Sequence, residues 1–318
     1  MKKTKLFSIL KLLRPRQWIK NFAVFAAITF SGHLFDGGLF YKTVIAFFIF
    51  CGVSSAIYVA NDILDVSKDK LHPFKKFRPL AHGDLSIPLA IAITILLTVG
   101  SIIGSLFITP AFFLIIIVYV ILQLSYSAFL KHVAIIDILM LAAGYIIRVL
   151  AGEFATGWHI SVWLLLTTIS LSLFLASGKR RQELTLISKF PASQIAATRK
   201  SLSHYSERLL DVYIAMFATS TFITYSFFTF FENQTGFKPS FSILFPDYLP
   251  TFLTRKWLMI TIAPVVYGLM RYLQDIYEKH EGESPEKVFL SDRPFFISII
   301  IWVVLLIFVI YFINPANY

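Results

Sequence analysis

The sequence is poor in charged residues and holds a single cysteine. Only 15% of its 318 residues are Asp, Glu, Lys or Arg, whereas a soluble domain carries about 25%. The one cysteine, Cys51, lies inside an apolar run, which excludes an intrachain disulfide and a zinc site built on cysteine pairs. Glycine-rich phosphate loops, histidines at metal spacing and Ser or Cys nucleophile motifs are also missing. These absences favour catalysis by a metal ion and by positioning over covalent catalysis.

Long hydrophobic runs fill most of the chain. Hydrophobic residues make up 57% of it, and about 20 consecutive apolar residues span a bilayer. Residues 1–20 carry no small-residue cleavage site, so the first apolar run is expected to stay as a helix. We predict an all-α polytopic membrane bundle, one domain over residues 1–318. Its nine predicted transmembrane helices are 21–38, 41–61, 86–107, 110–129, 133–154, 160–178, 209–231, 256–275 and 294–313.

Lysine and arginine gather on alternate connections between these helices. One side of the predicted membrane holds 24 of the 29 Lys and Arg residues, the other holds four, and Arg148 lies within the predicted helix 133–154. The positive-inside rule therefore predicts a cytoplasmic N-terminus and an outer C-terminus. The net charge of +11 further suggests anionic lipid or an anionic substrate as a partner, and not nucleic acid.

An acidic motif closes the second predicted helix, with the sequence N-D-I-L-D-V-S-K-D at residues 61–69. Spacings of three and four place Asp62, Asp65 and Asp69 on one helical face. Three carboxylates at a helix C-terminus repel one another and oppose the helix dipole, so a cation is expected there. Oxygen ligands favour Mg²⁺, which usually shares its other positions with substrate phosphates. The alternative is a solvated acidic helix end balanced by nearby lysines.

Basic residues lie close to the same predicted cytoplasmic ends. Arg14, Arg16 and Lys20 precede the first helix, and a run rich in Lys, Arg and Pro covers residues 70–80. Lys179, Arg180 and Arg181 end the sixth helix. Each group either binds phosphate or only sets the orientation of the chain in the membrane and complements a helix dipole. The adjacent Glu183 is a candidate to complete a metal site.

Two ionisable residues fall inside the predicted helix 133–154. Such groups are costly in a membrane and are functional by default, with a structural role as the alternative. Asp137 and Arg148 are eleven residues apart, which is about 16 Å of helix. They are therefore not expected to pair with each other, and each is expected to face a partner elsewhere.

The motif at 61–69 resembles the NDxxDxxxD motif of the UbiA superfamily of membrane prenyltransferases. Tyr126-Ser127, followed by Leu130-Lys131, is similar to that family's YS…LK segment, and nine helices agree with it. The resemblance implies a helical bundle with a central cavity and cytoplasmic caps. It also implies a diphosphate bound through Mg²⁺, with a lipid tail between the helices.

One position departs from the usual family pattern. Aromatic prenyltransferases carry a second DxxxD-type motif after the sixth helix, where this chain has Lys179-Arg180-Arg181-Gln182-Glu183. The variant resembles the decaprenyl-phosphate phosphoribosyltransferase subgroup. Five groups of residues carry this resemblance. They are 14–18 and 20–21; 72–73 through to 78–79; 130–132 and 137; 178–180; and 271–272 and 292–293.

The subgroup implies transfer of 5-phosphoribose from phosphoribosyl pyrophosphate to a polyprenyl phosphate, with pyrophosphate released, for a cell-envelope glycolipid precursor. It also implies the cytoplasmic (inner) membrane of a bacterium, with the active site facing the cytoplasm. The rival functions are an aromatic prenyltransferase and, more remotely, a membrane transporter. Small residues on the helix faces are compatible with a homo-oligomer but do not establish one.

Our hypothesis for the site combines the acidic motif with the basic residues. The predicted catalytic residues are Asp62, Asp65 and Asp69, which would hold Mg²⁺ together with Asn61 and Glu183. The predicted substrate-binding residues are Lys20, Arg78, Tyr126, Lys131, Lys179 and Arg180.

Overall fold

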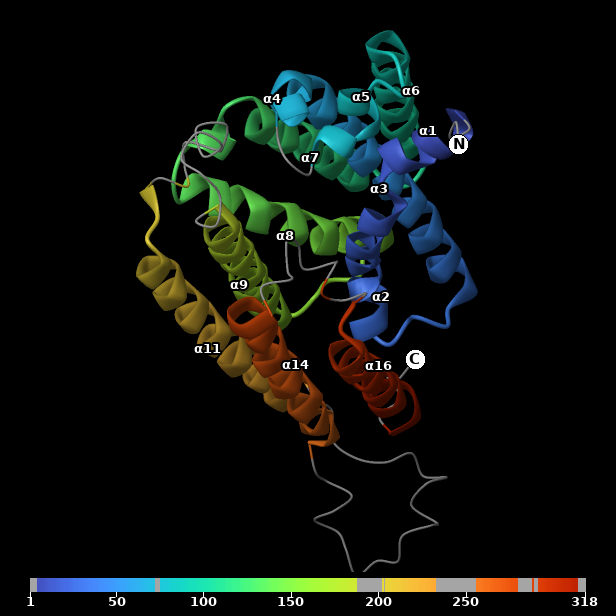
Figure 1. Cartoon of the computed structure of the whole chain (residues 1–318). Helices are drawn as coiled ribbons and strands as arrows, with labels where there is room; N and C mark the ends of the chain where they lie inside the picture. The colour runs from blue at the N-terminus through green and yellow to red at the C-terminus, as the bar shows by residue number, and fades with distance from the viewer. Residues whose placement is uncertain are drawn as a thin grey trace, which may run out of the picture.

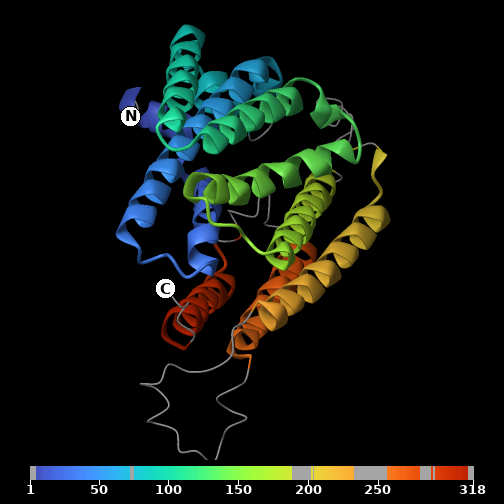
Figure 2. The ribbon, with the colours of Figure 1, turned by 180° about the vertical axis from the view of Figure 1, so that it is seen from behind.

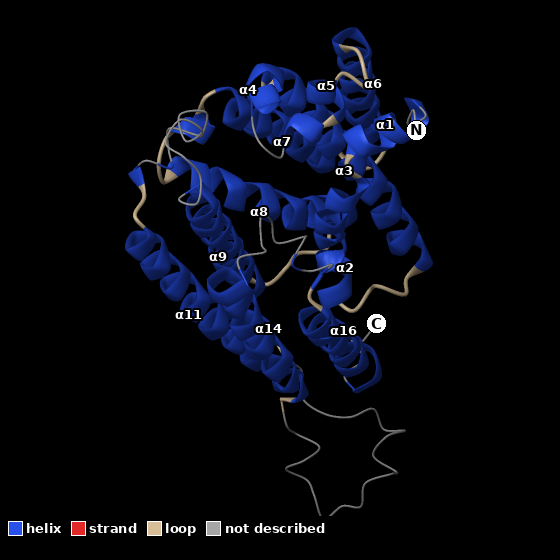
Figure 3. Cartoon of the chain, viewed as in Figure 1, coloured by secondary structure: helices blue, strands red, loops and turns tan. Residues whose placement is uncertain are grey.

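The computed structural model describes residues 5–71, 75–187, 202, 204–232, 256–279, 288 and 291–313, and these residues form helices and connections without any strand (Figure 3). Seven of the described helices are long and apolar enough to cross a membrane. They are α3 (Gly37–Leu64), α6 (Ile87–Leu106), α7 (Pro110–Ala128), α8 (Ile136–Thr156), α9 (Val162–Ile187), α11 (Glu207–Phe231) and α16 (Arg293–Phe308), which continues as the π-helical turn η7 (Val309–Ile313). The all-α prediction is confirmed.

Two of the nine predicted spans have a different form. The predicted helix 21–38 corresponds to a 3₁₀ segment, η1 (Pro15–Phe25), followed by the short helix α2 (Ala26–Phe30). The predicted helix 256–275 corresponds to a 3₁₀ turn, η5 (Trp257–Thr261), and the 13-residue helix α14 (Ile262–Gln274). Neither α2 nor α14 is long enough to count as a span by itself, so the described part of the chain does not confirm nine transmembrane helices.

Short helices gather at one end of the molecule, near the N-terminus (Figure 1). They are α1 (Lys5–Leu13), α4 (Val66–Leu71), the 3₁₀ turn η2 (Lys75–Phe77) and α5 (Pro79–His82). Leu12 of α1 and Leu80 of α5 pack with Val59 of α3 in a small buried cluster. Burial of these apolar side chains fixes the short helices over the end of α3 that carries the acidic motif.

The long helices follow one another around the molecule, with α8 crossing its middle (Figures 1 and 2). α3 packs on α6, α8 lies between α7 and α9, and α11 runs along α9. The C-terminal helices return to the N-terminal ones, because the hydroxyl of Tyr311 donates to the carbonyls of Ile28 and Thr29 and accepts from the amide of Leu34. The first and last helical segments are thereby joined.

The 3₁₀ segment η1 lies tightly against α8 and α3. A Cβ built on Gly152 of α8 would overlap the backbone carbonyl of Val24, so only glycine allows this approach. The indole of Trp18 donates to Ser55 of α3 (2.9 Å), and the buried amide of Asn21 donates to Ser54 (3.2 Å). These contacts hold the basic residues of η1 beside the acidic end of α3.

Candidate active site

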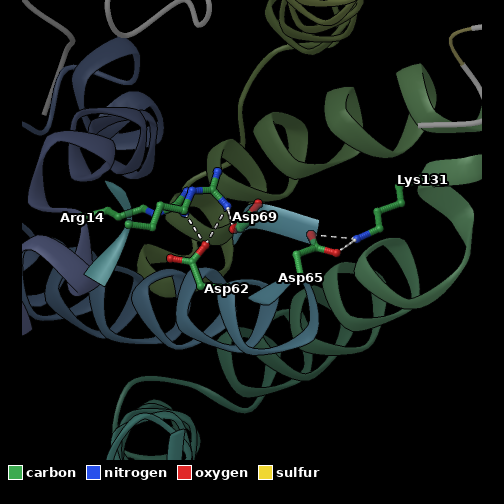
Figure 4. Close-up of polar contacts among 6 residues, drawn as sticks. Arg14, Asp62, Asp65, Asp69 and Lys131 are labelled. Atoms are coloured by element: carbon green, nitrogen blue, oxygen red, sulfur yellow. Dashed lines mark hydrogen bonds and ion pairs between the residues drawn. The ribbon is translucent and has the colours of Figure 1, made fainter. Parts of the chain in front are cut away.

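The acidic motif lies at a break between two helices. α3 ends at Leu64, Asp65 takes a non-helical conformation (φ −99°, ψ 5°), and α4 begins at Val66. The expectation of a single continuous helical face for the three aspartates is therefore wrong. The break separates the carboxylates: Asp62 and Asp69 turn toward a common arginine, whereas Asp65 points toward Lys131 (Figure 4).

Two arginines bind the first pair of carboxylates. Asp62 is almost fully buried and accepts from Arg14 (2.5 Å) and Arg78 (3.0 Å). The same Nη1 atom of Arg78 lies 2.6 Å from Asp69. Burial raises the pKa of Asp69 above its usual range, and the nearby Arg78 guanidinium opposes that shift. Arg14 and Arg78 thus bring the N-terminal segment and the 75–82 helices to the end of α3.

Asp65 has a separate partner from the next connection along the bundle. Lys131, on the 3₁₀ turn η3 (Leu130–His132) between α7 and α8, places its Nζ atom 2.9 Å and 3.0 Å from the two oxygens of Asp65. Lys131 is buried. Since a buried ammonium needs a charged partner, this contact fixes both side chains.

A second buried network lies between α8 and α9. Arg180 is fully buried, and its Nε atom lies 2.7 Å from Asp137, which is also fully buried. Arg180 also donates to Glu183 and to the hydroxyl of Tyr126 at the end of α7 (2.9 Å). The prediction that Asp137 faces a partner other than Arg148 is confirmed.

The connection between α7 and α8 contains a strained turn. Ile135 has φ 68° and ψ −50°, and the amide of Ile136 donates to the carbonyl of Ala134 (2.8 Å), which is the classic γ-turn, a rare conformation. The phenol of Tyr205 accepts from the amide of Ile135 (2.5 Å) and donates to Asp137 (2.6 Å). Burial and the hydrogen bond to Asp137 raise the pKa of Tyr205. Tyr205 therefore holds the turn that lies between Lys131 and Asp137.

The other predicted site residues lie on α3, α9 and η1. Asn61 is half-buried beside Asp62 on α3, and Lys179 is half-buried beside Arg180 on α9. Lys20 of η1 contacts Gln17 (2.7 Å) and the ring of Tyr145. Tyr205 carried no recognisable signal in the sequence. His72 and Pro73, which carry part of the resemblance to the subgroup, lie outside the described part of the chain.

The donors in the acidic motif are all oxygen atoms, which suits a hard cation such as Mg²⁺. The described residues contain no group of three or more His, Cys, Asp or Glu side chains arranged to hold a metal ion. Mg²⁺ needs only one or two protein carboxylates when phosphate oxygens complete its shell. Asp62, Asp65 and Asp69 therefore fit a metal that arrives with a phosphorylated substrate better than a metal held by protein ligands alone.

Comparison of the sequence with known proteins finds a match to the UbiA prenyltransferase family over residues 21–300. The chain is 34% identical over 299 residues to a decaprenyl-phosphate phosphoribosyltransferase of Mycolicibacterium smegmatis, with 93% of this chain and 90% of that protein covered. It is 34% identical to the protein of the same name from Corynebacterium glutamicum, with 95% and 86% covered.

The fold is similar to that of solved UbiA homologues. One from Archaeoglobus fulgidus, in a structure with DMAPP and Mg²⁺ bound, has a TM-score of 0.68 and 17% sequence identity, with 95% of this chain and 99% of that chain covered. A structure of digeranylgeranylglyceryl phosphate synthase has a TM-score of 0.61 and 18% identity, with 95% and 97% covered. At these identities the likeness concerns the fold alone.

Proposed function

The chain belongs to the UbiA prenyltransferase family, and from that premise we propose that it transfers 5-phosphoribose from phosphoribosyl pyrophosphate to a polyprenyl phosphate and releases pyrophosphate. Relatives at 33–34% identity over at least 93% of this chain carry the name decaprenyl-phosphate phosphoribosyltransferase. The observation that carries the proposal is the place and the contacts of Arg180. This buried residue contacts Asp137 and Tyr126, and it stands where aromatic prenyltransferases have a second acidic motif. Asp137 and Glu183 neutralise Arg180, and the half-buried Lys179 beside it supplies a positive charge that suits an acceptor that is itself a phosphate.

Asp62, Asp65 and Asp69 are the proposed ligands for Mg²⁺, with Asn61 beside them and Glu183 as a further candidate. When bound, the metal would neutralise charge on the leaving pyrophosphate. Arg14 and Arg78 form ion pairs with Asp62, at 2.5 Å and 3.0 Å. Both guanidiniums are partly exposed, so they are placed to bind phosphate oxygens beside the metal ligands.

In the proposed reaction, the bond between ribose C1 and the pyrophosphate oxygen breaks, and pyrophosphate leaves with the electron pair. An anionic oxygen of the polyprenyl phosphate forms the new bond to C1 from the opposite face. No proton is transferred, because the attacking oxygen is already ionised. The chain then needs no strong general base, and its task is to bind, orient and neutralise charge.

The acceptor phosphate is proposed to lie near Lys131, Lys179, Arg180 and Tyr126. Lys131 is fixed by Asp65, and Arg180 is fixed by Asp137 and Glu183. Lys131 lies on the other side of Asp65 from Arg14 (Figure 4), and Lys179 and Arg180 come from α9. The polyprenyl chain would lie among the apolar helices.

We further propose the cytoplasmic (inner) membrane of a bacterium as the location, with the acidic motif toward the cytoplasm and the product as a cell-envelope glycolipid precursor. The seven apolar helices support a multi-pass membrane protein, and the loop charges support the orientation. The lipid bilayer and the two phosphorylated substrates are the proposed partners.

The proposal is tested with purified protein in detergent, Mg²⁺, ribose-labelled phosphoribosyl pyrophosphate and a polyprenyl phosphate. We expect label to enter the lipid phase, and to require both the polyprenyl phosphate and the metal. If labelled lipid instead forms only from a prenyl diphosphate and an aromatic acid, the protein is an ordinary aromatic prenyltransferase and the proposal is wrong.

A further inference from the structure

Arg148 carries a positive charge inside the bundle, where its described hydrogen-bond partners are all neutral. It is buried in the middle of α8, and among the residues that the structure describes no Asp or Glu forms an ion pair with it. Its guanidinium donates to Asn21 (2.8 Å), to the hydroxyl of Tyr119 (2.9 Å) and to the carbonyl of Gly144. These neutral acceptors satisfy N–H groups but leave the charge uncompensated, which is costly in a low-dielectric interior.

A second cation approaches the same place. Lys20 of η1 has its Nζ atom 5.8 Å from the centre of the Tyr145 ring. Arg148 lies on the next turn of α8 and donates to Asn21, the residue that follows Lys20 in the chain. Two like charges held together in a protein interior favour an anion between or beside them.

Three tyrosines complete this group, which we call the Arg148 cluster: Lys20, Tyr58, Tyr119, Tyr145 and Arg148. The guanidinium of Arg148 lies 5.2 Å from the centre of the Tyr119 ring, and Tyr145 lies one turn before Arg148 on α8. Tyr58 lies one turn after Ser54 on α3, and Asn21 contacts both Ser54 and Arg148. Tyr hydroxyls donate to phosphate oxygens as readily as they accept from a guanidinium. Lys20, Tyr58 and Tyr145 keep part of their surface exposed, whereas Arg148 and Tyr119 are buried.

The cluster adjoins the acidic motif. Tyr58 precedes Asp62 by four residues on α3, which is roughly 6 Å further along the helix. Arg14 connects the two places, because its guanidinium contacts Asp62 at 2.5 Å and lies 5.3 Å from the centre of the Tyr58 ring. A ligand with one anionic end at the acidic motif and another about one helical turn away would therefore meet both sites.

We propose that the Arg148 cluster binds the 5-phosphate of the donor, while the acidic motif and Arg78 take its pyrophosphate. This inference rests on the proposed function and deepens it, since phosphoribosyl pyrophosphate has anionic groups at both ends of its ribose. A prenyl diphosphate would place an uncharged hydrocarbon against Lys20 and Arg148 and would leave both cations desolvated. The cluster therefore selects a sugar phosphate donor over a prenyl diphosphate.

The inference predicts that substitutions can weaken the binding of the two ends of the donor separately. Ribose 5-phosphate and Mg²⁺-pyrophosphate are used as competing ligands against labelled donor with the full-length protein in detergent. In Lys20→Gln and Arg148→Gln we expect the inhibition constant of ribose 5-phosphate to rise about tenfold or more, with that of pyrophosphate unchanged. Arg148→Lys should recover part of the loss, and Lys42→Gln, at the opposite end of α3, should match wild type.

The outcomes separate this inference from the proposed function. If wild type forms the phosphoribosyl lipid but folded Lys20→Gln and Arg148→Gln bind ribose 5-phosphate as wild type does, the 5-phosphate assignment is wrong while the function stands. A parallel weakening of both ligands shows a structural role for the cluster and also overturns the assignment. Should Arg148→Gln fail to fold, the half-exposed Lys20→Gln decides. If wild type transfers no phosphoribose, the proposed function itself is wrong.

Discussion

The Nζ atom of Lys131 lies 2.9 Å and 3.0 Å from the two carboxylate oxygens of Asp65, although the residues are 66 positions apart in the chain. This contact joins the break after α3 to the connection between α7 and α8. It also separates Asp65 from Asp62 and Asp69, which converge on Arg78. The acidic motif therefore has two sides, each with its own cations, and our predictions address both sides and the elements that hold them.

Asp65→Asn should abolish transfer, with a loss of roughly 100-fold or more in turnover, because a neutral amide neither holds Mg²⁺ well nor pairs with Lys131. The protein should remain folded in detergent. Turnover and size-exclusion profile are measured beside Asp84→Asn, a change to an aspartate that pairs only with His82 at 2.8 Å among described ion pairs. Near wild-type turnover of Asp65→Asn would remove the metal assignment.

Arg78→Gln should raise the KM for the donor by about tenfold or more, since one guanidinium now contacts both Asp62 and Asp69. Arg78→Lys should recover only part of the affinity, because an ammonium lacks the planar fork that serves two acceptors. Steady-state kinetics with varied donor check this. Full recovery with lysine would show that charge alone matters at this position.

Tyr205→Phe should lower both stability and turnover. The substitution keeps the ring in its apolar cluster but removes the hydroxyl that accepts from the amide of Ile135 and donates to Asp137. Loss of a donor to the fully buried Asp137 costs about 1–3 kcal/mol. Thermal melting and turnover are compared with Tyr213→Phe, whose ring packs against the same cluster. If the two variants behave alike, Tyr205 does not hold the γ-turn.

Gly152→Ala should destabilise the protein by about 1–3 kcal/mol, the usual cost of forcing extra volume into a packed contact. The new Cβ would overlap the carbonyl of Val24 and push η1 away from α8. Gly100→Ala in α6 is the matched control, because no atom lies within 4 Å of the added Cβ. Equal melting temperatures for the two variants would contradict the close packing of η1.

The orientation is tested by cysteine labelling. In a Cys51→Ser background, Ser86→Cys lies at the start of α6 on the predicted cytoplasmic side, and His159→Cys lies between α8 and α9 on the predicted outer side. A membrane-impermeant maleimide on intact cells should label the cysteine at 159 and reach the one at 86 only after lysis. The reverse pattern would place the acidic motif outside the cell.

Most of the fold could be predicted from apolar runs, because helix length and hydropathy are local properties of the chain. The seven described spans agree with their predicted ranges to within a few residues, α9 excepted, which continues to Ile187. The form of η1 could not be predicted in this way. Its 3₁₀ conformation depends on contacts with α3 and on the close approach to Gly152, which are set by tertiary packing.

The site could be predicted in part, because its residues have unusual types at unusual places. Asp62, Asp65, Arg78, Lys131 and Arg180 all lie at one end of the bundle, as the motifs indicate. Their pairing could not be predicted, because a single non-helical residue, Asp65, redirects the carboxylates. Arg148 was marked by its place inside an apolar helix, but its neighbours come from three other elements.

The central claim is tested most directly by the fate of both halves of the donor in one reaction. Phosphoribosyl pyrophosphate labelled separately in the ribose and in the terminal phosphate is incubated with purified protein, Mg²⁺ and a polyprenyl phosphate. We predict ribose label in the lipid phase and an equal amount of labelled pyrophosphate in water, both lost in Asp65→Asn. Release of pyrophosphate without ribosylated lipid, or labelled lipid that is unaffected by Asp65→Asn, would contradict the account.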